Sequence, residues 1–305
     1  MSGQNCPLNL ELDLETAIKD AVRRLAEAGV ATPRADAELL AAHVLGVGRG
    51  EVAAAALRGA VPSEDLAAEF QGLVERRARR EPLQHLTGWA AFRGLALHVG
   101  PGVFVPRPET EVVAGIAIEE AAQLVDAGEW PVVVDLGTGS GAIAIAVAVE
   151  IPRARVTALE VDPGALEWAA RNIAELAPGV DLRRGDIAHA ARTVLSDLAG
   201  GVDVVVANPP YIPPDGEPQD PEVRDHDPVL ALYGGGDDGL AVPRAVVATA
   251  EELLKPGGLL VMEHADSQPD AARALARPPA WADARTANDL TGRPRALVAR
   301  RTGAQ

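Results

Sequence analysis

The chain has 305 residues, of which 48% are hydrophobic and only 3% aromatic, so a substantial core has to be packed mainly from Ala, Val, Leu and Ile. The formal net charge is −16, and residues 89–305 carry 18 Lys and Arg against 31 Asp and Glu, a net charge of −13. This sign disfavours an enzyme that binds duplex nucleic acid, because such a protein needs cations to replace phosphate counterions.

The single cysteine, Cys6, excludes an internal disulfide framework. The longest apolar run, residues 142–149, is far too short to span a bilayer, and no N-terminal segment joins a basic start to an apolar stretch. A soluble, cytoplasmic protein without a membrane partner is therefore expected. The dense basic run of Arg76, Arg77, Arg79 and Arg80 is interpreted as a solvated helix face, with a local basic patch as the alternative.

Residues 13–80 are predicted to be helical. Six apolar residues follow the spacing of one buried helical stripe, namely Leu14, Ala17, Ile18, Ala21, Val22 and Leu25. Gly29 is placed to end this helix, and Thr32 followed by Pro33 opens a second one. A third helix begins at Ser63 and stops before Pro82. The pattern predicts a small helical bundle over residues 1–88.

The pattern changes to strands after Gly88. Leu95, Leu97 and Val99 alternate with polar or small residues, Pro101-Gly102 is a turn, and Val103 and Val105 alternate again. A β-hairpin within residues 89–106 is therefore predicted to connect the bundle to a second domain over residues 107–305.

From residue 107 onward, helical and strand patterns alternate. Strands are predicted at 132–136, 155–160, 202–207, 258–262, 284–287 and 296–300, and helices at 109–125, 142–150, 163–176 and 245–254. This alternation predicts an α/β domain with a parallel, doubly wound, Rossmann-like sheet. Residues 212–239 are rich in Pro, Asp and Gly and lack a period, so they are expected to form a lid, a binding loop or a disordered segment.

The first motif is Asp135-Leu136-Gly137-Thr138-Gly139-Ser140-Gly141, between a predicted strand and a predicted helix. Glycines there let the backbone turn tightly and approach a ligand, which the amides at the helix N-terminus then face. Glu160, at the end of the next strand, can accept hydrogen bonds from both ribose hydroxyls of a nucleoside cofactor. A glycine turn without any ligand is the alternative.

The spacing of the glycines distinguishes two cofactor classes. A dinucleotide loop favours G-x-G-x-x-G, whereas this loop is G-x-G-x-G with Asp135 before it. That carboxylate would repel a pyrophosphate and suits a cationic amino-acid end, so S-adenosylmethionine is predicted and a nicotinamide oxidoreductase is disfavoured. By position, Asp186 can accept from the adenine amino group with Ile187 against the ring, although a turn residue is the alternative for Asp186.

The second motif, Asn208-Pro209-Pro210-Tyr211, follows the predicted strand at 202–207, at the strand end where ligands bind in such sheets. The Asn208 side-chain oxygen and the Pro209 carbonyl can each accept one N–H of a planar NH2 group, and the two prolines fix the backbone so that both acceptors point the same way. Tyr211 offers a flat face to the same group. The alternative is a proline turn that merely ends a strand.

Two acceptors on an amide NH2 group favour a pyramidal nitrogen whose lone pair points at a methyl donor. Catalysis would then consist of positioning and electrostatics. No metal is expected, because the six histidines show no ligand spacing and Cys6 is alone.

Taken together, these motifs resemble the protein-(glutamine-N5) methyltransferases that modify class I peptide chain release factors. The resemblance spans nearly the whole chain and includes residues 81–88, 105–111, 135–141, 208–212, 230–240 and 289–293. The glycine loop and Asn-Pro-Pro-Tyr occur in other amino-methyltransferases. The segment Arg107-Pro108-Glu109-Thr110-Glu111, combined with an N-terminal helical domain, is much more specific.

The resemblance implies a class I methyltransferase domain that converts S-adenosylmethionine to S-adenosylhomocysteine. It implies that residues 137–141, Glu160 and Asp186 bind the cofactor and that Asn208 and Pro209 hold the glutamine amide, with Tyr211 beside it. Arg107 and Glu109 would lie next to cofactor and glutamine, while capping of the following helix is their alternative role. A glutamine is a small, common group, so residues 1–88 are expected to recognise the protein substrate of a monomeric enzyme.

Three positions depart from the family pattern. Residue 160 is Glu where Asp is frequent, Glu263-His264-Ala265 replaces a usual Glu-x-Gly, and Ile187 stands where an aromatic residue is common. Two rival functions remain. A nucleic-acid amino-methyltransferase is disfavoured by the charge of residues 89–305 and by the lack of a base-reading module, and a non-catalytic nucleoside-binding protein is disfavoured by the intact Asn208 and Pro209 acceptors.

Overall fold

The computed structural model describes residues 13–303. The chain divides into two compact units at the bond between Gly88 and Trp89, and each unit has its own hydrophobic core. Cys6 lies outside the described residues. Within the described residues, no single helix is long and apolar enough to cross a membrane, and one bent pair, Pro33–Leu45 with Arg49–Leu57, passes that test by length and composition alone.

The N-terminal unit is helical throughout its described part. Its helices are α1 (Leu14–Glu27), α2 (Pro33–Leu45), α3 (Arg49–Leu57), α4 (Glu64–Ala78) and α5 (Leu83–Thr87). The side chain of Asp13 accepts from Thr16 N at 2.8 Å and so caps α1, while Gly46 ends α2 in the left-handed conformation that glycine tolerates. α3 lies within the range predicted to be helical, but its bounds were not predicted because it is alanine-rich with little amphipathic contrast; α5, with only five residues, was missed.

A buried ion pair in this unit corrects the interpretation of the basic run. Arg77 is only 6% exposed, and its Nε donates to Oδ2 of the buried Asp36 at 2.7 Å. Arg76 pairs with Glu81, and Arg80 donates to the backbone oxygen of Gly29. The run therefore ties α4 to its neighbours, and the expectation of a fully solvated helix face was wrong for Arg77.

The C-terminal unit begins with the predicted hairpin, but its turn lies earlier in the sequence than predicted. β1 (Trp89–Phe92) pairs antiparallel with β2 (Leu95–His98), and the turn is Arg93-Gly94, both with positive φ. Pro101-Gly102 is a turn as predicted, but it does not join two strands, because Val99, Val103 and Val105 pack beside α8 rather than in a ladder. The alternation of apolar residues in this segment therefore reflects buried side chains and not strand pairing.

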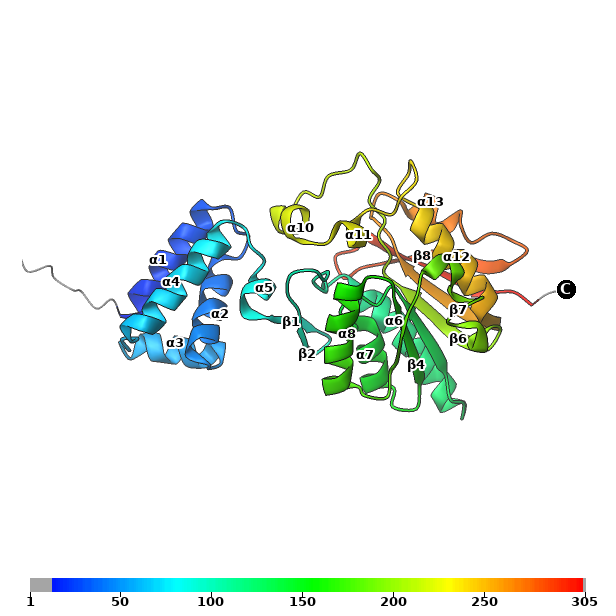
Figure 1. Cartoon of the computed structure of the whole chain (residues 1–305), viewed down its shortest axis with the longest axis horizontal. Coiled ribbons are helices and arrows are strands. Elements are labelled where there is room, and N and C mark those ends of the chain that lie inside the picture. Colours follow the sequence, from blue (N-terminus) through cyan, green and yellow to red (C-terminus); the bar gives the residue numbers. More distant parts are fainter. Residues whose placement is uncertain (1–12, 304–305) are drawn as a thin grey trace, which may run out of the picture. The chain divides into compact units, whose positions relative to one another are not determined.

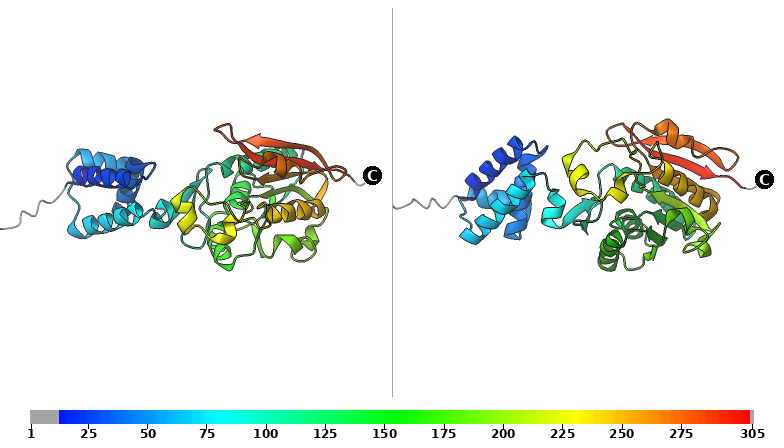
Figure 2. Two further views of the ribbon diagram at one scale, coloured as in Figure 1. Left: turned by 90° about the horizontal axis from the view of Figure 1, so that it is seen from above. Right: turned by 45° about the horizontal axis from the view of Figure 1, so that its top comes forward.

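A seven-stranded sheet with the order β5-β4-β3-β6-β7-β9-β8 forms the centre of the unit (Figure 1). Its strands are β3 (Val132–Leu136), β4 (Arg155–Glu160), β5 (Asp181–Arg184), β6 (Val202–Ala207), β7 (Leu254–Glu263), β8 (Trp281–Asn288) and β9 (Pro294–Arg301). The sequence predicted a parallel sheet, but the observed sheet is mixed, because β9 runs antiparallel to both β7 and β8. A short turn joins β8 to β9, so this pair can only form a hairpin (Figure 2).

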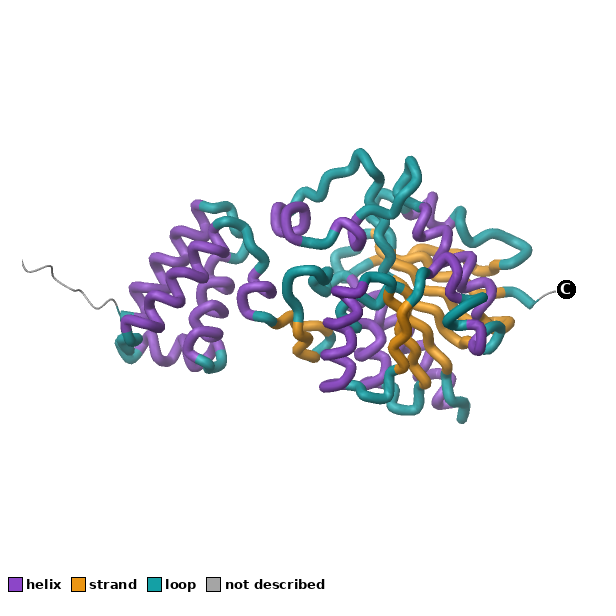
Figure 3. Tube along the Cα trace, viewed as in Figure 1, coloured by secondary structure: helices purple, strands orange, loops and turns teal. Residues whose placement is uncertain are grey.

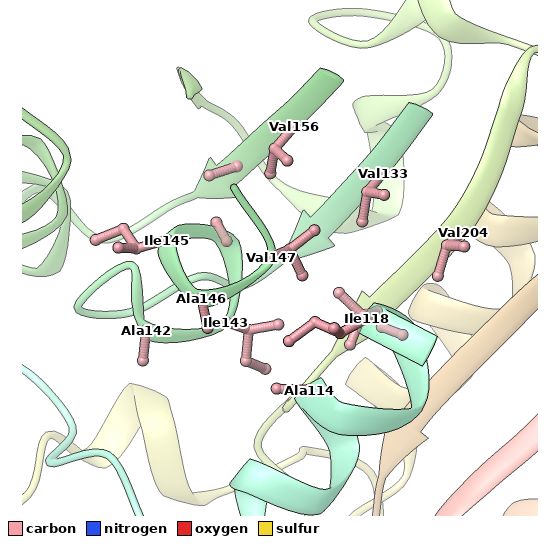
Figure 4. Close-up of a cluster of buried hydrophobic side chains, with 14 of the residues drawn as sticks. Ala114, Ile118, Val133, Ala142, Ile143, Ile145, Ala146, Val147, Val156 and Val204 are labelled. Atoms are coloured by element: carbon pink, nitrogen blue, oxygen red, sulfur yellow. The ribbon is translucent and has the colours of Figure 1, made fainter. Parts of the chain in front are cut away.

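Helices cover both faces of the sheet. One face carries α6 (Thr110–Asp126), α7 (Ala142–Glu150) and α8 (Pro163–Leu176), and the other carries α9 (Ile187–Ala190), α12 (Ala241–Leu253) and α13 (Pro269–Arg273). Along β3, Val133 belongs to the first core and Val134 to the second, as expected for a strand that is buried on both faces. Figure 4 shows Val133 and Val204 directed toward Ile118 and Val147 in the first core.

Residues 212–239 connect the fourth parallel strand to α12. They contain two short helices, α10 (Pro221–His226) and α11 (Val229–Leu232) (Figure 3). An isolated parallel bridge joins Ile212 to Tyr233. Residues 212–239 thus form an ordered loop that folds back on the end of β6, rather than a disordered segment.

A 3-10 turn, Ser196–Leu198, lies before β6 in the chain.

Candidate active site

The predicted site residues lie at the carboxyl ends of neighbouring strands. Asp135 is in β3, Glu160 ends β4, and Asn208 follows β6 directly. In the register of the sheet, Leu136 pairs with Ala207 and Ala207 pairs with Met262. The glycine loop, the Asn-Pro-Pro-Tyr turn and Glu263 at the end of β7 therefore share one edge of the sheet, where doubly wound folds bind ligands.

Asp135 lies fully buried beneath the glycine loop and holds it. Its Oδ2 accepts from Thr138 Oγ1 at 2.6 Å and from the Ala144 amide at 3.2 Å. Its Oδ1 has no hydrogen-bond partner among the described residues. Burial raises the pKa of Asp135 to about 7, although the Thr138 and Ala144 hydrogen bonds act in the opposite direction.

The glycine loop has the conformation and the space that a bound nucleoside cofactor needs. Gly137, Gly139 and Gly141 all have positive φ, and a Cβ at Gly139 would meet open space. The fully buried Asn172 anchors the loop from below, since its Nδ2 donates to the Ser140 carbonyl and to the His98 carbonyl, each at 2.9 Å. With the orphaned Asp135 Oδ1, these features fit a cofactor whose cationic amino end needs a buried acceptor.

Glu160 is more engaged than the sequence indicated. Its Oε2 accepts from the Gly139 amide at 2.8 Å, and its Oε1 accepts from the amides of Val161 and Asp162. A carboxylate has about four lone-pair positions, so one of them remains for a ligand hydroxyl. The residue thus fixes the glycine loop against the end of β4, and its contact with a ribose stays a prediction.

Asp186 and Ile187 lie at the start of α9, after β5. Asp186 is exposed and caps this helix by accepting from the Ala188 amide at 2.9 Å, as the alternative turn role requires. The Ile187 side chain reaches the glycine loop, because its Cδ1 lies 3.7 Å from the position of a Cβ on Gly137. Ile187 is therefore placed to form an apolar wall beside the loop.

The Asn-Pro-Pro-Tyr turn presents the two acceptors that the sequence predicted. Asn208 Nδ2 donates to Thr110 Oγ1 at 3.2 Å, and no hydrogen bond to Asn208 Oδ1 or to the Pro209 carbonyl is formed within residues 13–303. The Tyr211 hydroxyl lies 3.4 Å from Oε1 of Glu263. Burial, followed by the charge of Glu263, raises the pKa of the Tyr211 phenol, so this hydroxyl stays a donor.

Glu263 and Thr110 join the turn to two other elements. Thr110 opens α6, and its Oγ1 donates to Glu263 Oε2 at 2.8 Å. Both residues are buried, with exposures of 4% and 3%. Burial raises the pKa of Glu263 to about 7, while the Thr110 hydroxyl and the Arg295 guanidinium lower it. β7 ends at Glu263, and the backbone that follows is fixed by the His264 amide, which donates to the Arg295 carbonyl.

Two glycines of the loop after α11 allow it to pack directly on the turn. A Cβ on Gly234 would lie 2.6 Å from the Pro210 carbonyl oxygen, and a Cβ on Gly239 would lie 2.5 Å from that of Tyr211. Gln268 Nε2 also donates to the Tyr211 carbonyl at 3.0 Å. The turn is thus held by backbone contacts that no other residue type permits at these two positions.

Arg107 and Glu109 lie directly before α6 in the chain. Arg107 pairs with the buried Asp227, and its guanidinium lies 5.0 Å from the centre of the Phe104 ring. Burial raises the pKa of Asp227, although Arg107 opposes this shift. Glu109 occupies the N-cap position of α6 without a capping side-chain hydrogen bond, and its charge acts on Tyr211 and Glu263. Arg107 therefore fastens the loop containing α10, which the sequence did not indicate.

Reasoning from the sequence missed the structural roles of four residues, namely Thr110, Asp227, Gly234 and Gly239. No local spacing reveals these roles, because Thr110 and Asp227 have partners 153 and 120 positions away and the two glycines pack on Pro210 and Tyr211, more than 20 positions earlier. The available signal was indirect: Thr110 and the two glycines lie inside the motifs that carry the family resemblance.

Comparison with known proteins identifies the class and then the family. Residues 131–293 match the family model of a methyltransferase domain, and residues 16–88 match that of the PrmC N-terminal domain. With the sheet order and the loop described above, the protein is a Rossmann-like methyltransferase.

Three curated relatives are named release factor glutamine methyltransferase. The protein from Streptomyces coelicolor is 51% identical over 93% of this chain and 96% of its own length. Those from Mycolicibacterium smegmatis and Bifidobacterium longum are 49% and 45% identical, over 94% and 92% of this chain and 98% and 97% of their own lengths. The chain belongs to the family of release factor glutamine methyltransferases.

Proposed function

We propose that this protein transfers a methyl group from S-adenosylmethionine to the side-chain amide nitrogen, N5, of a glutamine in class I peptide chain release factors. The observation that carries the proposal is a pair of acceptors, Asn208 Oδ1 and the Pro209 carbonyl, that have no hydrogen-bond partner in the described part of the chain and lie at the same sheet edge as the glycine loop. The same substrate is supported by relatives that match nearly the whole chain and are named release factor glutamine methyltransferase.

The cofactor would be held by the residues around the glycine loop. The amides and open space of residues 137–141 would receive its amino-acid part, and Asp135 Oδ1 would accept from its ammonium group. Glu160 would contact the ribose with its remaining lone pair, Ile187 would pack against the adenine, and Asp186 would accept from the adenine amino group. When bound, the cofactor would supply an electrophilic methyl group on a sulfonium sulfur and leave as S-adenosylhomocysteine, while the methylated amide nitrogen would release one of its two protons to solvent. No metal is expected to take part.

The chain's own contribution to the chemistry is to orient a poor nucleophile. An amide nitrogen delocalises its lone pair into its carbonyl, and acceptors on both of its hydrogens favour a geometry in which that pair is available. Asn208 and Pro209 provide the acceptors, Pro210 keeps the backbone fixed, and Tyr211 forms the adjacent wall. Such positioning in a dry site accounts for large rate effects.

We further propose that the helical unit, residues 1–88, recognises the folded release factor and takes no part in the chemistry. Every candidate catalytic residue lies in the other unit. The proposal keeps the expectation of a cytoplasmic monomer without a stable nucleic-acid or membrane partner. Residues 89–305 alone, once shown to fold, should bind S-adenosylmethionine but lose most activity on an intact release factor. Equal rates for the two forms would contradict this role.

The rival function is methylation of an exocyclic amine of a nucleobase. The Asn208 and Pro209 acceptors would suit that group equally well, whereas the net charge of −13 on residues 89–305 opposes a nucleic-acid substrate. The two functions are separated by offering labelled S-adenosylmethionine with a release factor, or with RNA and DNA, in parallel reactions.

The decisive experiment combines this assay with Asn208→Ala. Mass spectrometry should place the methyl group on a glutamine of the release factor. Asn208→Ala should lower kcat by roughly 10²-fold to 10³-fold, because one contact to the reacting group is lost. Calorimetry should find its cofactor affinity within a small factor of the wild type. Asn288→Ala, an exposed asparagine at the end of β8, is the matched control. Label on nucleic acid alone would overturn the proposal.

A further inference from the structure

We propose that Thr110 and Glu263 are positioning residues that hold the Asn208 amide in one of its two orientations, with the oxygen directed at the substrate. This inference rests on the proposed function, because it concerns the acceptor that Asn208 offers to an incoming NH2 group. It assigns a role to two buried side chains that come from different elements, the start of α6 and the end of β7.

The direction of the hydrogen bonds carries the inference. The side-chain amide of Asn208 has an oxygen at one end and an NH2 group at the other, and the two ends have nearly the same shape. Its orientation must therefore be set by what the neighbouring atoms can donate or accept. The only hydrogen bond of the Asn208 side chain within residues 13–303 is the one from Nδ2 to Thr110 Oγ1, at 3.2 Å.

Thr110 alone would not settle the orientation, because a hydroxyl can either donate or accept. Its single proton is already committed, since Oγ1 donates to Glu263 Oε2 at 2.8 Å. An ionised carboxylate can only accept, so the hydroxyl proton has to point at Glu263. Thr110 is then able only to accept from Asn208, and this requires the NH2 end of Asn208 to face it. The oxygen end is left free for the substrate.

The other oxygen of Glu263 acts on the opposite side of the turn. Oε1 lies 3.4 Å from the Tyr211 hydroxyl, so one carboxylate contacts Tyr211 directly and Asn208 through Thr110. The charged groups that face Glu263 are Arg295, which favours its ionised form, and Glu109, which opposes it. At pH 8, above its pKa of about 7, Glu263 is an acceptor and the chain of hydrogen bonds runs in one direction.

The reverse arrangement would present the wrong group to the substrate. If Asn208 were turned over, its NH2 group would meet the NH2 group of the glutamine, and two donors cannot form a hydrogen bond. The nitrogen would lose one of the two acceptors that make its lone pair available. A release of Asn208 from Thr110 should therefore lower kcat while leaving cofactor binding unchanged.

Two substitutions of nearly equal shape test the idea. Thr110→Val removes the hydroxyl and keeps the volume. Glu263→Gln introduces an NH2 group that can donate to Thr110, which frees the threonine proton to donate to Asn208 Oδ1 and so stabilises the reversed amide. Thr110→Ser keeps the hydroxyl. Thr286→Val is the matched control, because Thr286 Oγ1 is buried in β8 without a partner among the described residues.

The experiment measures kcat and KM on the intact release factor at pH 8, cofactor affinity by calorimetry, and the thermal midpoint of each variant. Thr110→Val and Glu263→Gln should each lower kcat roughly 10-fold to 100-fold, the effect of one hydrogen bond involving a charged group, with cofactor affinity within twofold of the wild type. Thr110→Ser should recover most of kcat, and Thr286→Val should match the wild type.

The outcomes separate this inference from the function on which it rests. A wild-type protein without activity on release factors would overturn the proposed function, and the inference with it. An active wild type with Thr110→Val and Glu263→Gln at the wild-type kcat would overturn the inference alone. Loss of activity in Thr110→Ser equal to that in Thr110→Val, with all variants folded, would also overturn it, because the hydroxyl would then not be what matters.

Discussion

Gly234→Ala is the substitution for which the structure predicts the sharpest effect on the site. The added Cβ would lie 2.6 Å from the Pro210 carbonyl oxygen and closer still to that of Gly239, whereas real Cβ atoms keep at least 3.0 Å. Neither neighbour is a flexible side-chain end, because both atoms belong to the backbone. Relief requires the loop after α11 to open by about 1 Å between Gly234 and Gly239, where the Cβ would lie 1.8 Å from the carbonyl oxygen, and requires this loop and the Asn-Pro-Pro-Tyr turn to move apart by several tenths of an ångström.

Such a movement would displace the acceptors of the substrate amide. A misplacement of about 1 Å at a reacting group costs roughly 10²-fold in rate, so a loss of kcat of about 10-fold or more is expected for this smaller shift. Crowding of this kind also destabilises a folded protein by about 1–3 kcal/mol. Cofactor affinity should change little, because the glycine loop is held by Asp135 and Asn172 through hydrogen bonds to Thr138 and to the Ser140 carbonyl.

The assay compares kcat on the release factor, cofactor affinity by calorimetry, and unfolding in urea. Gly179→Ala serves as the control, since a Cβ there would meet nothing within 4 Å and the backbone needs no left-handed conformation. A Gly234→Ala protein with the stability and kcat of the control would refute the reasoning, because it would show that the contact between the two loops does not position the turn.

Three further perturbations test other parts of the molecule. Glu160→Ala should weaken cofactor affinity by about 10-fold to 100-fold in calorimetry, because the Gly139 amide loses its acceptor and a ribose hydroxyl does too; unchanged affinity would move the ribose contact elsewhere. Asp36→Ala removes the buried partner of Arg77 and should lower the free energy of unfolding by roughly 3–5 kcal/mol in urea, and a loss below about 1 kcal/mol would argue against a tightly coupled pair. The third concerns pH: the pKa of Glu263 rises from 4.5 to about 7 on folding, so the folded state keeps a proton that the unfolded state releases, and stability should fall as pH rises through this window. Glu263→Gln lacks this contribution, and parallel stability–pH curves for the two proteins would refute it.

The sequence by itself determined much of the fold, because the signals were local. The helix boundaries of α7 and α8 and the bounds of β3, β4 and β6 were predicted from apolar runs, caps and glycines, all of which act within a few residues. The motifs also placed the glycine loop and the Asn-Pro-Pro-Tyr turn at the ends of parallel strands, where a doubly wound sheet must bring them together.

Only the tertiary structure decided which atoms are already engaged and which remain free. Alternating apolar residues at Val99, Val103 and Val105 looked like a strand, but burial against α8 produces the same pattern without a ladder of hydrogen bonds. The long-range pair of Thr110 and Glu263 sets the orientation of Asn208 from 153 positions apart. Hydrogen-bond direction depends on three-dimensional neighbours rather than on spacing along the chain, and for this reason the sequence named the acceptor but not what holds it.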